Sequence, residues 1–210
     1  VCSSDLDQVY LASADASENL NGYLVGTTFG ATLNGEALGR YRTSTGVDFT
    51  TLETPSFGTD APSSLAEFRQ GEGAPNAAPK VGPIVINEIM YNPSGGDVEF
   101  VELYNLSAEA LDLTDWDLQG GAFLFPAGTV MEAGSFLLLI DTNLITVAQF
   151  RSQYAVPSVV PILGHNLILA NEGETLRLEM PHDTPGVTDI LVDRVQYNDK
   201  RSEEHTSELQ

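Results

Sequence analysis

A series of short apolar stretches, each of strand length and separated by turn-forming residues, constrains the fold of this chain more than any other feature. The series begins at residue 84, and its turns lie at residues 92–96, 120–121, 132–134 and 171–173. Such a succession is typical of an antiparallel β-sandwich. We therefore predict strands at residues 84–91, 99–104, 116–118, 136–140, 167–170, 175–179 and 190–197.

One stretch departs from this pattern and predicts a short helical insertion. Thr142 or Asn143 can cap a helix that continues to about Tyr154, and Pro157 ends it because the residue before a proline resists helical geometry. The apolar positions of this stretch share roughly one helix face. They are Leu144, Val147, Ala148 and Tyr154.

Two observations bear on how the strands pack. Trp116 lies between acidic residues but has Leu113 and Leu118 close by, so we predict that its ring is in the core. In residues 99–104, alternation places one glutamate on each face. Periodicity alone therefore does not decide which face is inward.

The chain is strongly acidic, with a formal net charge of −21. Nucleic-acid affinity depends largely on Lys and Arg, so nucleic acid is not an expected partner, and the excess of acids indicates solubility in a salty or extracellular medium. No apolar run approaches the roughly 20 residues that a membrane-spanning helix needs. We therefore expect no membrane span in these residues.

Both ends of the chain resemble translated sequencing adapter. Reverse-complementary codons can encode Val1–Leu6 and residues 201–206, and we set residues 1–6 and 201–210 aside. This removes only four acids and one base, so the acid excess remains. It also removes Cys2, the single cysteine, which leaves no thiol for a disulfide or a metal site in the natural segment.

Residues 58–82 are rich in Gly, Pro, Ala and Ser and are predicted to be a linker. The part before it, residues 7–57, has strand candidates at residues 8–12, 22–26 and 37–41, too few to bury a secure core. Its first two strands resemble residues 173–178 and 189–193. We therefore expect a tandem repeat: 7–57 is the C-terminal part of a first module, and 83–200 is a second module that lacks its last strand.

Several segments together resemble the lamin tail domain, an immunoglobulin-like sandwich found in nuclear lamins and in large exported bacterial proteins. The resemblance covers most of residues 84–200, and residues 150–154 are similar to the bacterial branch. It implies an all-β fold with one helical insertion. The segments that carry it are residues 84–93, 99–105, 113–118, 125–129 and 136–139.

A calcium site is one alternative, because this hard cation takes several oxygen ligands. The spacing of the acids does not match an EF-hand loop, and a solvated acidic rim is the competing interpretation. Residues 15–21 are a second candidate with the same weakness. The candidate ligands are Asp97, Glu99, Asp112, Asp115 and Asp117.

For other possible chemistry, a structural or surface role is the favoured interpretation. Carboxylate pairs for glycoside hydrolysis can be drawn from Glu88, Glu99 and Glu102, but any sandwich so rich in acids offers such pairs. His165 and His182 are expected in loops, without the further ligands of a zinc site. We predict no catalytic residue and no cofactor. The sequence also contains a glycosylation sequon, residues 105–107.

The resemblance implies a non-catalytic module of an exported or cell-surface protein, which acts as a spacer or adhesion unit. Its expected partners are other domains of the parent chain, or an extracellular protein or glycan. The alternatives are an accessory substrate-binding domain of an extracellular hydrolase or nuclease, and a calcium-dependent carbohydrate-binding module. Because the second module is expected to have an open edge, residues 37–41 are predicted to fill it.

Overall fold

The computed structural model describes residues 7–43, 46–57 and 76–198. The chain divides into two compact units, which are described separately: Val1–Val81 with His182–Ile190, and Gly82–Pro181 with Leu191–Gln210. Both predicted adapter ends and most of the predicted linker lie outside the described residues. The predicted division at residues 57 and 83, and the tandem repeat, therefore stay predictions.

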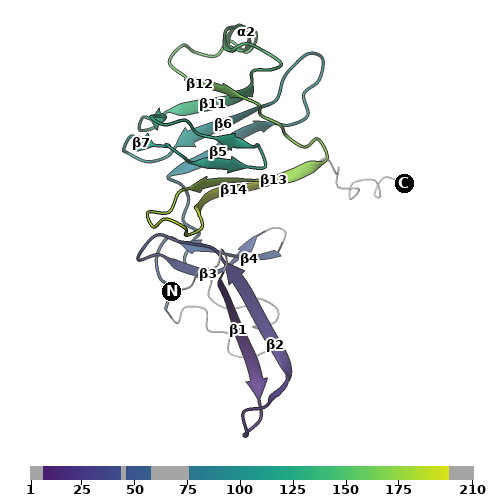
Figure 1. Cartoon of the computed structure of the whole chain (residues 1–210), viewed down its shortest axis with the longest axis vertical. Helices are drawn as coiled ribbons and strands as arrows, with labels where there is room; N and C mark the ends of the chain where they lie inside the picture. The colour runs from purple at the N-terminus through teal and green to yellow at the C-terminus, as the bar shows by residue number, and fades with distance from the viewer. Residues whose placement is uncertain (1–6, 44–45, 58–75, 199–210) are drawn as a thin grey trace, which may run out of the picture. The chain divides into compact units, whose positions relative to one another are not determined.

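The described residues of the first unit form two antiparallel strand pairs, drawn in purple and blue in Figure 1. Strand β1 (Asp7–Ala14) pairs with β2 (Leu20–Phe29), and β3 (Ala37–Thr43) pairs with β4 (Gly46–Leu52). The three predicted strands are confirmed, and β4 was missed. Residues 37–41 form a two-stranded sheet with β4, so the prediction that they complete the sheet of the second unit is wrong.

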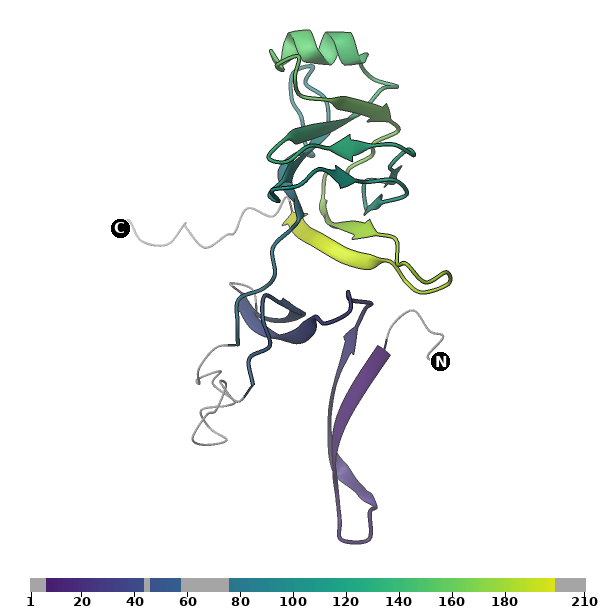
Figure 2. The same cartoon turned by 90° about the vertical axis from the view of Figure 1, so that its left-hand side faces the viewer.

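The second unit contains two four-stranded sheets, seen in Figures 1 and 2. Sheet I has the order β12-β11-β6-β5, and sheet II has the order β14-β13-β8-β9. Sheet I contains β5 (Ile84–Met90), β6 (Phe100–Asn105), β11 (Phe136–Asp141) and β12 (Ile162–His165). Sheet II contains β8 (Asp117–Gln119), β9 (Phe123–Leu124), β13 (Gly173–Met180) and β14 (Ile190–Asn198). A separate pair is formed by β7 (Leu111–Asp112) and β10 (Val130–Met131).

The helical insertion connects β11 to β12, which are parallel. Parallel neighbours need a crossover connection, commonly a helix, and this explains why one helix interrupts the strands. Helix α2 (Val147–Gln153) begins after Thr146, which forms a capping box with Gln149. The predicted caps, Thr142 and Asn143, are wrong because the Asp141 carboxylate accepts from the Asn143 N–H and holds this segment in a turn.

One predicted strand, residues 167–170, is also wrong. Leu167 and Leu169 are buried in the core, as their apolar character suggests, but the Leu169 N–H donates to a Glu99 carboxylate oxygen rather than to a strand. The strand that pairs with β11 is β12, five residues earlier, and sequence reasoning missed it. The other predicted strands of the second unit are confirmed within a few residues.

The main core of the second unit includes Trp116, as predicted, and residues of both sheets. The structure also decides the orientation of β6. Val101 and Leu103 belong to this core, whereas Phe100 belongs to a second cluster with Phe150 of α2. The helix therefore packs on the outer face of sheet I through this second cluster, and Figure 1 shows it next to β12. The second unit is an all-β, immunoglobulin-like sandwich with one short helix among its described residues.

Candidate functional site

The five acids considered for calcium lie in different parts of the second unit. Asp97 accepts from Gln153 Nε2 (3.2 Å) and from the Tyr154 hydroxyl (3.1 Å), beside the end of α2. Glu99 contacts the loop that precedes β13. Among residues 7–43, 46–57 and 76–198 there is no group of three or more His, Cys, Asp or Glu side chains that can hold a metal.

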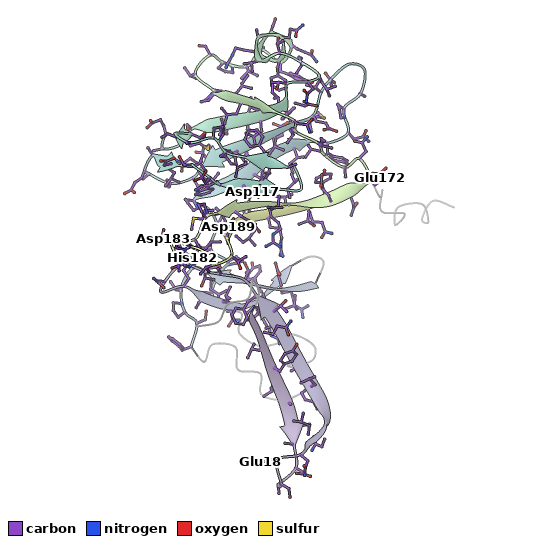
Figure 3. The ribbon with its side chains drawn as sticks, in the orientation of Figure 1. Glu18, Asp117, Glu172, His182, Asp183 and Asp189 are labelled. Atoms are coloured by element: carbon purple, nitrogen blue, oxygen red, sulfur yellow. The ribbon has the colours of Figure 1, made fainter. Side chains whose placement is uncertain are left out.

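The remaining three candidates follow one another along the chain but have separate roles. Asp112 Oδ1 accepts from the Thr114 hydroxyl (2.6 Å) and N–H (2.9 Å), and these bonds hold the pKa of its carboxyl below the usual value. The N–H of Asp115 donates to the Phe125 carbonyl at 3.2 Å. Asp117 is on β8 and accepts from Gln119, and Figure 3 shows its place in the sheet.

The second calcium candidate, the turn between β1 and β2 in the first unit, also has a structural explanation. Asp15 Oδ1 accepts from the N–H groups of Asn19 (3.0 Å) and Ser17 (2.8 Å). These bonds hold the pKa of the Asp15 carboxyl below its usual value. Glu18, at the tip of this hairpin in Figure 3, has a φ of 67°, a conformation that such tight turns use.

Of the glutamates considered for glycoside hydrolysis, Glu88 and Glu102 are register partners on the neighbouring strands β5 and β6, and Glu99 lies outside this pair. His182 is in the loop between β13 and β14, as predicted, where its Nδ1 accepts from the Thr184 N–H at 2.9 Å (Figure 3). His165 ends β12 rather than lying in a loop. Glu102 accepts from Asn87 Nδ2 at 2.7 Å, whereas Glu99 contacts Leu169.

The sequon asparagine, Asn105, is fully buried at 0% exposure. Its Nδ2 donates to the carbonyls of Glu109, Met131 and Glu132 at 2.9–3.0 Å, and its Oδ1 accepts from the Ser107 N–H and hydroxyl. An asparagine used in this way is inaccessible for glycosylation in the folded chain. The sequence signal that it has a structural role is its position at the end of a strand, directly before a turn.

Two glutamates hold consecutive backbone N–H groups of the segment between β12 and β13. Glu99 accepts from Leu169 at 3.1 Å, and Glu174 accepts from Ala170 at 2.7 Å and from the Tyr197 hydroxyl at 2.5 Å. We call Glu99 and Glu174 the carboxylate pair. It anchors the segment that carries two buried leucines, and sequence reasoning missed it because the residues are far apart in the chain.

The surroundings of Glu99 disfavour its negative charge. Burial raises the pKa of the Glu99 carboxyl, and the negative charges of Asp141 and Glu174 raise it further, against the opposing effect of the Leu169 N–H. Burial and the bond to Glu174 likewise raise the pKa of the Tyr197 hydroxyl. Perturbed groups occur in active sites, but burial of a carboxylate that has a structural role also perturbs its pKa.

Side chains connect the edges of the two sheets. The backbone N–H of Ile86 on β5 donates to Asp193 Oδ2 on β14 at 2.7 Å. Further along, the rings of Tyr91 and Tyr197 lie 4.3 Å apart, and the Tyr91 hydroxyl donates to the Asn198 carbonyl at 3.4 Å. We call this line of contacts the β5–β14 seam.

An open groove of about 460 Å³ lies beside α2. It is only moderately apolar, because glutamines and a serine share its lining with aliphatic residues. Its open shape suits a surface contact better than an enclosed substrate. The lining residues are Gly96, Val98, Leu144, Ile145, Gln149, Ser152 and Gln153.

Two four-stranded sheets around one apolar core, with polar side chains that hold loops and edges in place, define an immunoglobulin-like β module. The family model of the lamin tail domain matches residues 77–199, which is more than half of the chain. The chain belongs to the lamin tail domain family, and the resemblance stated from the sequence is confirmed. A search of curated proteins finds no match to it. No helix among the described residues is long and apolar enough to cross a membrane.

Proposed function

We propose that this lamin tail domain is a non-catalytic spacer and interaction module of a large exported or cell-surface multidomain protein. The observation that carries the proposal is how the acids of the second unit are used. Glu99 and Glu174 hold a loop, Asp112 holds a turn, and Asp193 holds the edge of β5. Carboxylates that accept backbone N–H groups stabilise the fold, and this use supports a structural role for these acids.

The charge of the chain supports the same function. At a formal net charge of −21, the surface repels phosphate groups and keeps an extended multidomain chain soluble. The partners we propose are other domains of the same parent protein, and an extracellular protein or glycan that contacts the exposed loops and edges. The extracellular location rests on the similarity of residues 150–154 to the bacterial branch of the family.

Long-read sequencing outward from within residues 84–198 tests this function. We expect an open reading frame that encodes further lamin tail modules and an export signal. A frame that places this module beside a hydrolase or nuclease domain would support the accessory-domain alternative instead. A frame that encodes a protein without an export signal would contradict the proposed location.

A calcium titration tests the remaining alternative on the purified chain. Because the five candidate acids lie in separate places, we expect the melting temperature in millimolar CaCl₂ to equal that in EDTA. A ligand that binds only the folded state raises the melting temperature as its concentration rises. A rise with calcium that magnesium does not produce would therefore favour a calcium-dependent module.

A further inference from the structure

We propose that one face of the β1–β2 hairpin binds a neutral β-linked glycan by stacking a sugar ring on Tyr10. This inference rests on the proposed function and assigns its glycan partner to one surface. Three register pairs form this surface, because cross-strand partners have their side chains on the same face of a hairpin. We call it the tyrosine face, and its residues are Gln8, Tyr10 and Ala12 of β1 with Thr28, Gly26 and Leu24 of β2.

The ring of Tyr10 lies across the backbone of β2 and is open to solvent. Gly26 is its register partner, and a Cβ added to Gly26 would lie 2.5 Å from Tyr10 Cδ1 and 2.6 Å from Cε1. The ring therefore occupies the space of the missing side chain. The Tyr10 hydroxyl donates to Gln8 Oε1, yet Tyr10 remains 58% exposed. A flat aromatic surface that is held in place and exposed is suited to stacking.

An open groove of about 430 Å³ borders the ring, and Leu24, Gly26, Thr27 and Thr28 line it together with Tyr10. Leu24 is 61% exposed and extends the apolar surface, whereas the threonine hydroxyls add hydrogen-bonding groups. Such a combination fits a pyranose ring. Its C–H bonds contact the negative face of the aromatic ring, and its hydroxyl groups bond to the polar side chains at the margin.

The charge of the tyrosine face selects a neutral ligand. None of its six described residues is charged, although the formal net charge of the chain is −21. The rest of the chain repels an anionic ligand, and a cationic ligand meets no carboxylate on this face. A glycan with equatorial hydroxyl groups, such as a β-glucan, is neutral and has flat apolar ring faces.

The related strand β13 indicates that the tyrosine face points away from any core. When Leu11 is aligned with Leu178, Tyr10 aligns with Arg177. Arg177 pairs with Glu179 at 2.7 Å, and alternation places both on the side of β13 opposite the buried Leu178. Tyr10 likewise lies on the side of β1 opposite Leu11. A segment that covers Leu11 would therefore leave the tyrosine face accessible to a ligand.

The test is an NMR titration of the ¹⁵N-labelled full chain with cellohexaose, laminarihexaose and chitohexaose. EDTA is present, so that the result is separate from calcium-dependent binding. We expect saturable shifts of β1 and β2 amides with at least one of these probes. The same probe oxidised at C6 to the uronate keeps its rings and linkage, and should bind about tenfold more weakly because it carries carboxylates.

Four results of this titration would overturn the inference. They are the absence of shifts at millimolar concentrations of all three probes, shifts confined to other strands, and equal binding of the oxidised probe. The fourth is tighter binding, at the same amides, of an uncharged peptide of alternating serine and leucine, which would show that this face takes a protein.

Substitution of exposed tyrosines tests the stacking. Tyr10→Leu keeps an apolar side chain without a flat aromatic surface and should weaken binding about tenfold. Tyr10→Phe keeps the ring and should bind like the unchanged chain. Tyr23→Leu is the matched control, because Tyr23 is 56% exposed but alternation places it on the opposite face of β2. Equal weakening by Tyr10→Leu and Tyr23→Leu would overturn the assigned site.

A glycine substitution tests the position of the ring while the ring itself is unchanged. The added Cβ of Gly26→Ala must displace Tyr10, so this variant should bind more weakly. Gly30→Ala is the matched control, because a Cβ there would meet open space. Unchanged binding by Gly26→Ala would contradict the role of the ring position. If a variant loses the hairpin amide signals, the comparison of neutral and oxidised probes on the unchanged chain still decides.

The proposed function and the tyrosine face are tested separately. Failure of every probe to bind would leave the spacer function standing, because the reading frame tests that function. A reading frame that contradicts the spacer function would in turn leave the measured glycan binding unchanged.

Discussion

Two hairpins of similar sequence have very different surroundings in this molecule. In the first unit, Val9 of β1 is 54% exposed and Leu11 is 68% exposed. When the two hairpin sequences are aligned so that Leu11 matches Leu178, Val9 matches Leu176. Leu176 and Leu178, on β13 of the second unit, are both 0% exposed. The local sequence is therefore enough to form a hairpin, but only an opposite sheet turns its apolar face into a core.

The difference matters because a two-stranded hairpin alone is marginally stable in water. Strands β13 and β14 face sheet I across the main core, whereas the first unit has only two-stranded sheets among its described residues. Four pairs of measurements compare the two units, and they are given from the largest expected effect to the smallest.

The largest contrast is between matched leucines. Leu178→Ala should lower the free energy of unfolding of the second unit by about 2–5 kcal/mol, because it leaves a cavity in a packed core. Leu11→Ala should change the stability of the first unit by less than about 0.5 kcal/mol, because its side chain is already in water. Urea denaturation followed separately for each unit by NMR measures both. Similar losses at the two sites would mean that the β1–β2 face is covered in solution.

Asn105 and Asn21 give the second pair. Asn105→Ala leaves three backbone carbonyls without their donor and should cost about 2–4 kcal/mol. Asn21 accepts from the exposed Ser13 hydroxyl, and Asn21→Ala should cost less than about 0.5 kcal/mol. The same denaturation experiment applies. A small loss at Asn105 would show that water can replace its side chain.

Two glycines with positive φ distinguish the energetic cost of an unfavourable backbone conformation from that of a steric clash. Gly22 has a φ of 94°, and a Cβ added there would meet open space, whereas a Cβ on Gly173, with a φ of 105°, would lie 2.5 Å from the Tyr197 carbonyl oxygen. Gly22→Ala should therefore cost about 1–2 kcal/mol from conformation alone. Gly173→Ala should cost measurably more, because β14 must also move. Equal shifts in the two denaturation midpoints would contradict this difference.

The smallest effect is a pH dependence of opposite sign in the two units. The pKa of Glu99 is raised in the folded state, so its contribution to stability is complete below the unfolded pKa and is lost as the pH rises through the folded pKa. The pKa of Asp15 is lowered, so its contribution is present above the unfolded pKa and is lost as the pH falls through the folded value.

Carboxyl ¹³C NMR titration measures both groups, with the pKa of Glu99 expected above the ordinary glutamate value of 4.5 and that of Asp15 below the ordinary aspartate value of 3.8. Glu99→Gln keeps an oxygen acceptor for Leu169 and removes the charge, so it should stabilise the second unit at neutral pH and flatten its pH profile. Asp15→Asn is the matched control in the first unit and should have the opposite effect on stability. A Glu99 titration at or below pH 4.5 would contradict the assigned role of burial.

Much of the fold follows from the sequence, because its strands combine apolar stretches with strong turn residues. Trp116 was predictable as a core residue from its apolar neighbours. The loop at residues 167–170 was not predictable. Its backbone N–H groups donate to the carboxylates of Glu99 and Glu174 instead of to a neighbouring strand, and Glu99 is distant in the chain. The parallel pairing of β11 with β12 was also missed, since pairing direction depends on the path of the connection through α2.

The candidate site residues show the same difference between what the sequence predicts and what depends on distant contacts. Sequence reasoning collected acids by their closeness along the chain, as with Asp112, Asp115 and Asp117, and the structure assigns them to separate contacts. The contacts that distinguish the second unit join residues that are far apart, such as Ile86 with Asp193. Spacing along a strand says which face a side chain is on, but not which distant group it meets.

The amino-acid sequence by itself determined the family, the all-β class and the alternation of strands with turns, because these depend on local turn chemistry and on a period of two residues. The tertiary structure alone decided which apolar face is buried, which carboxylates hold loops and which edges meet at the seam. Those outcomes depend on packing between segments that are distant in the chain, and burial and long-range hydrogen bonds exist only once the two sheets have come together.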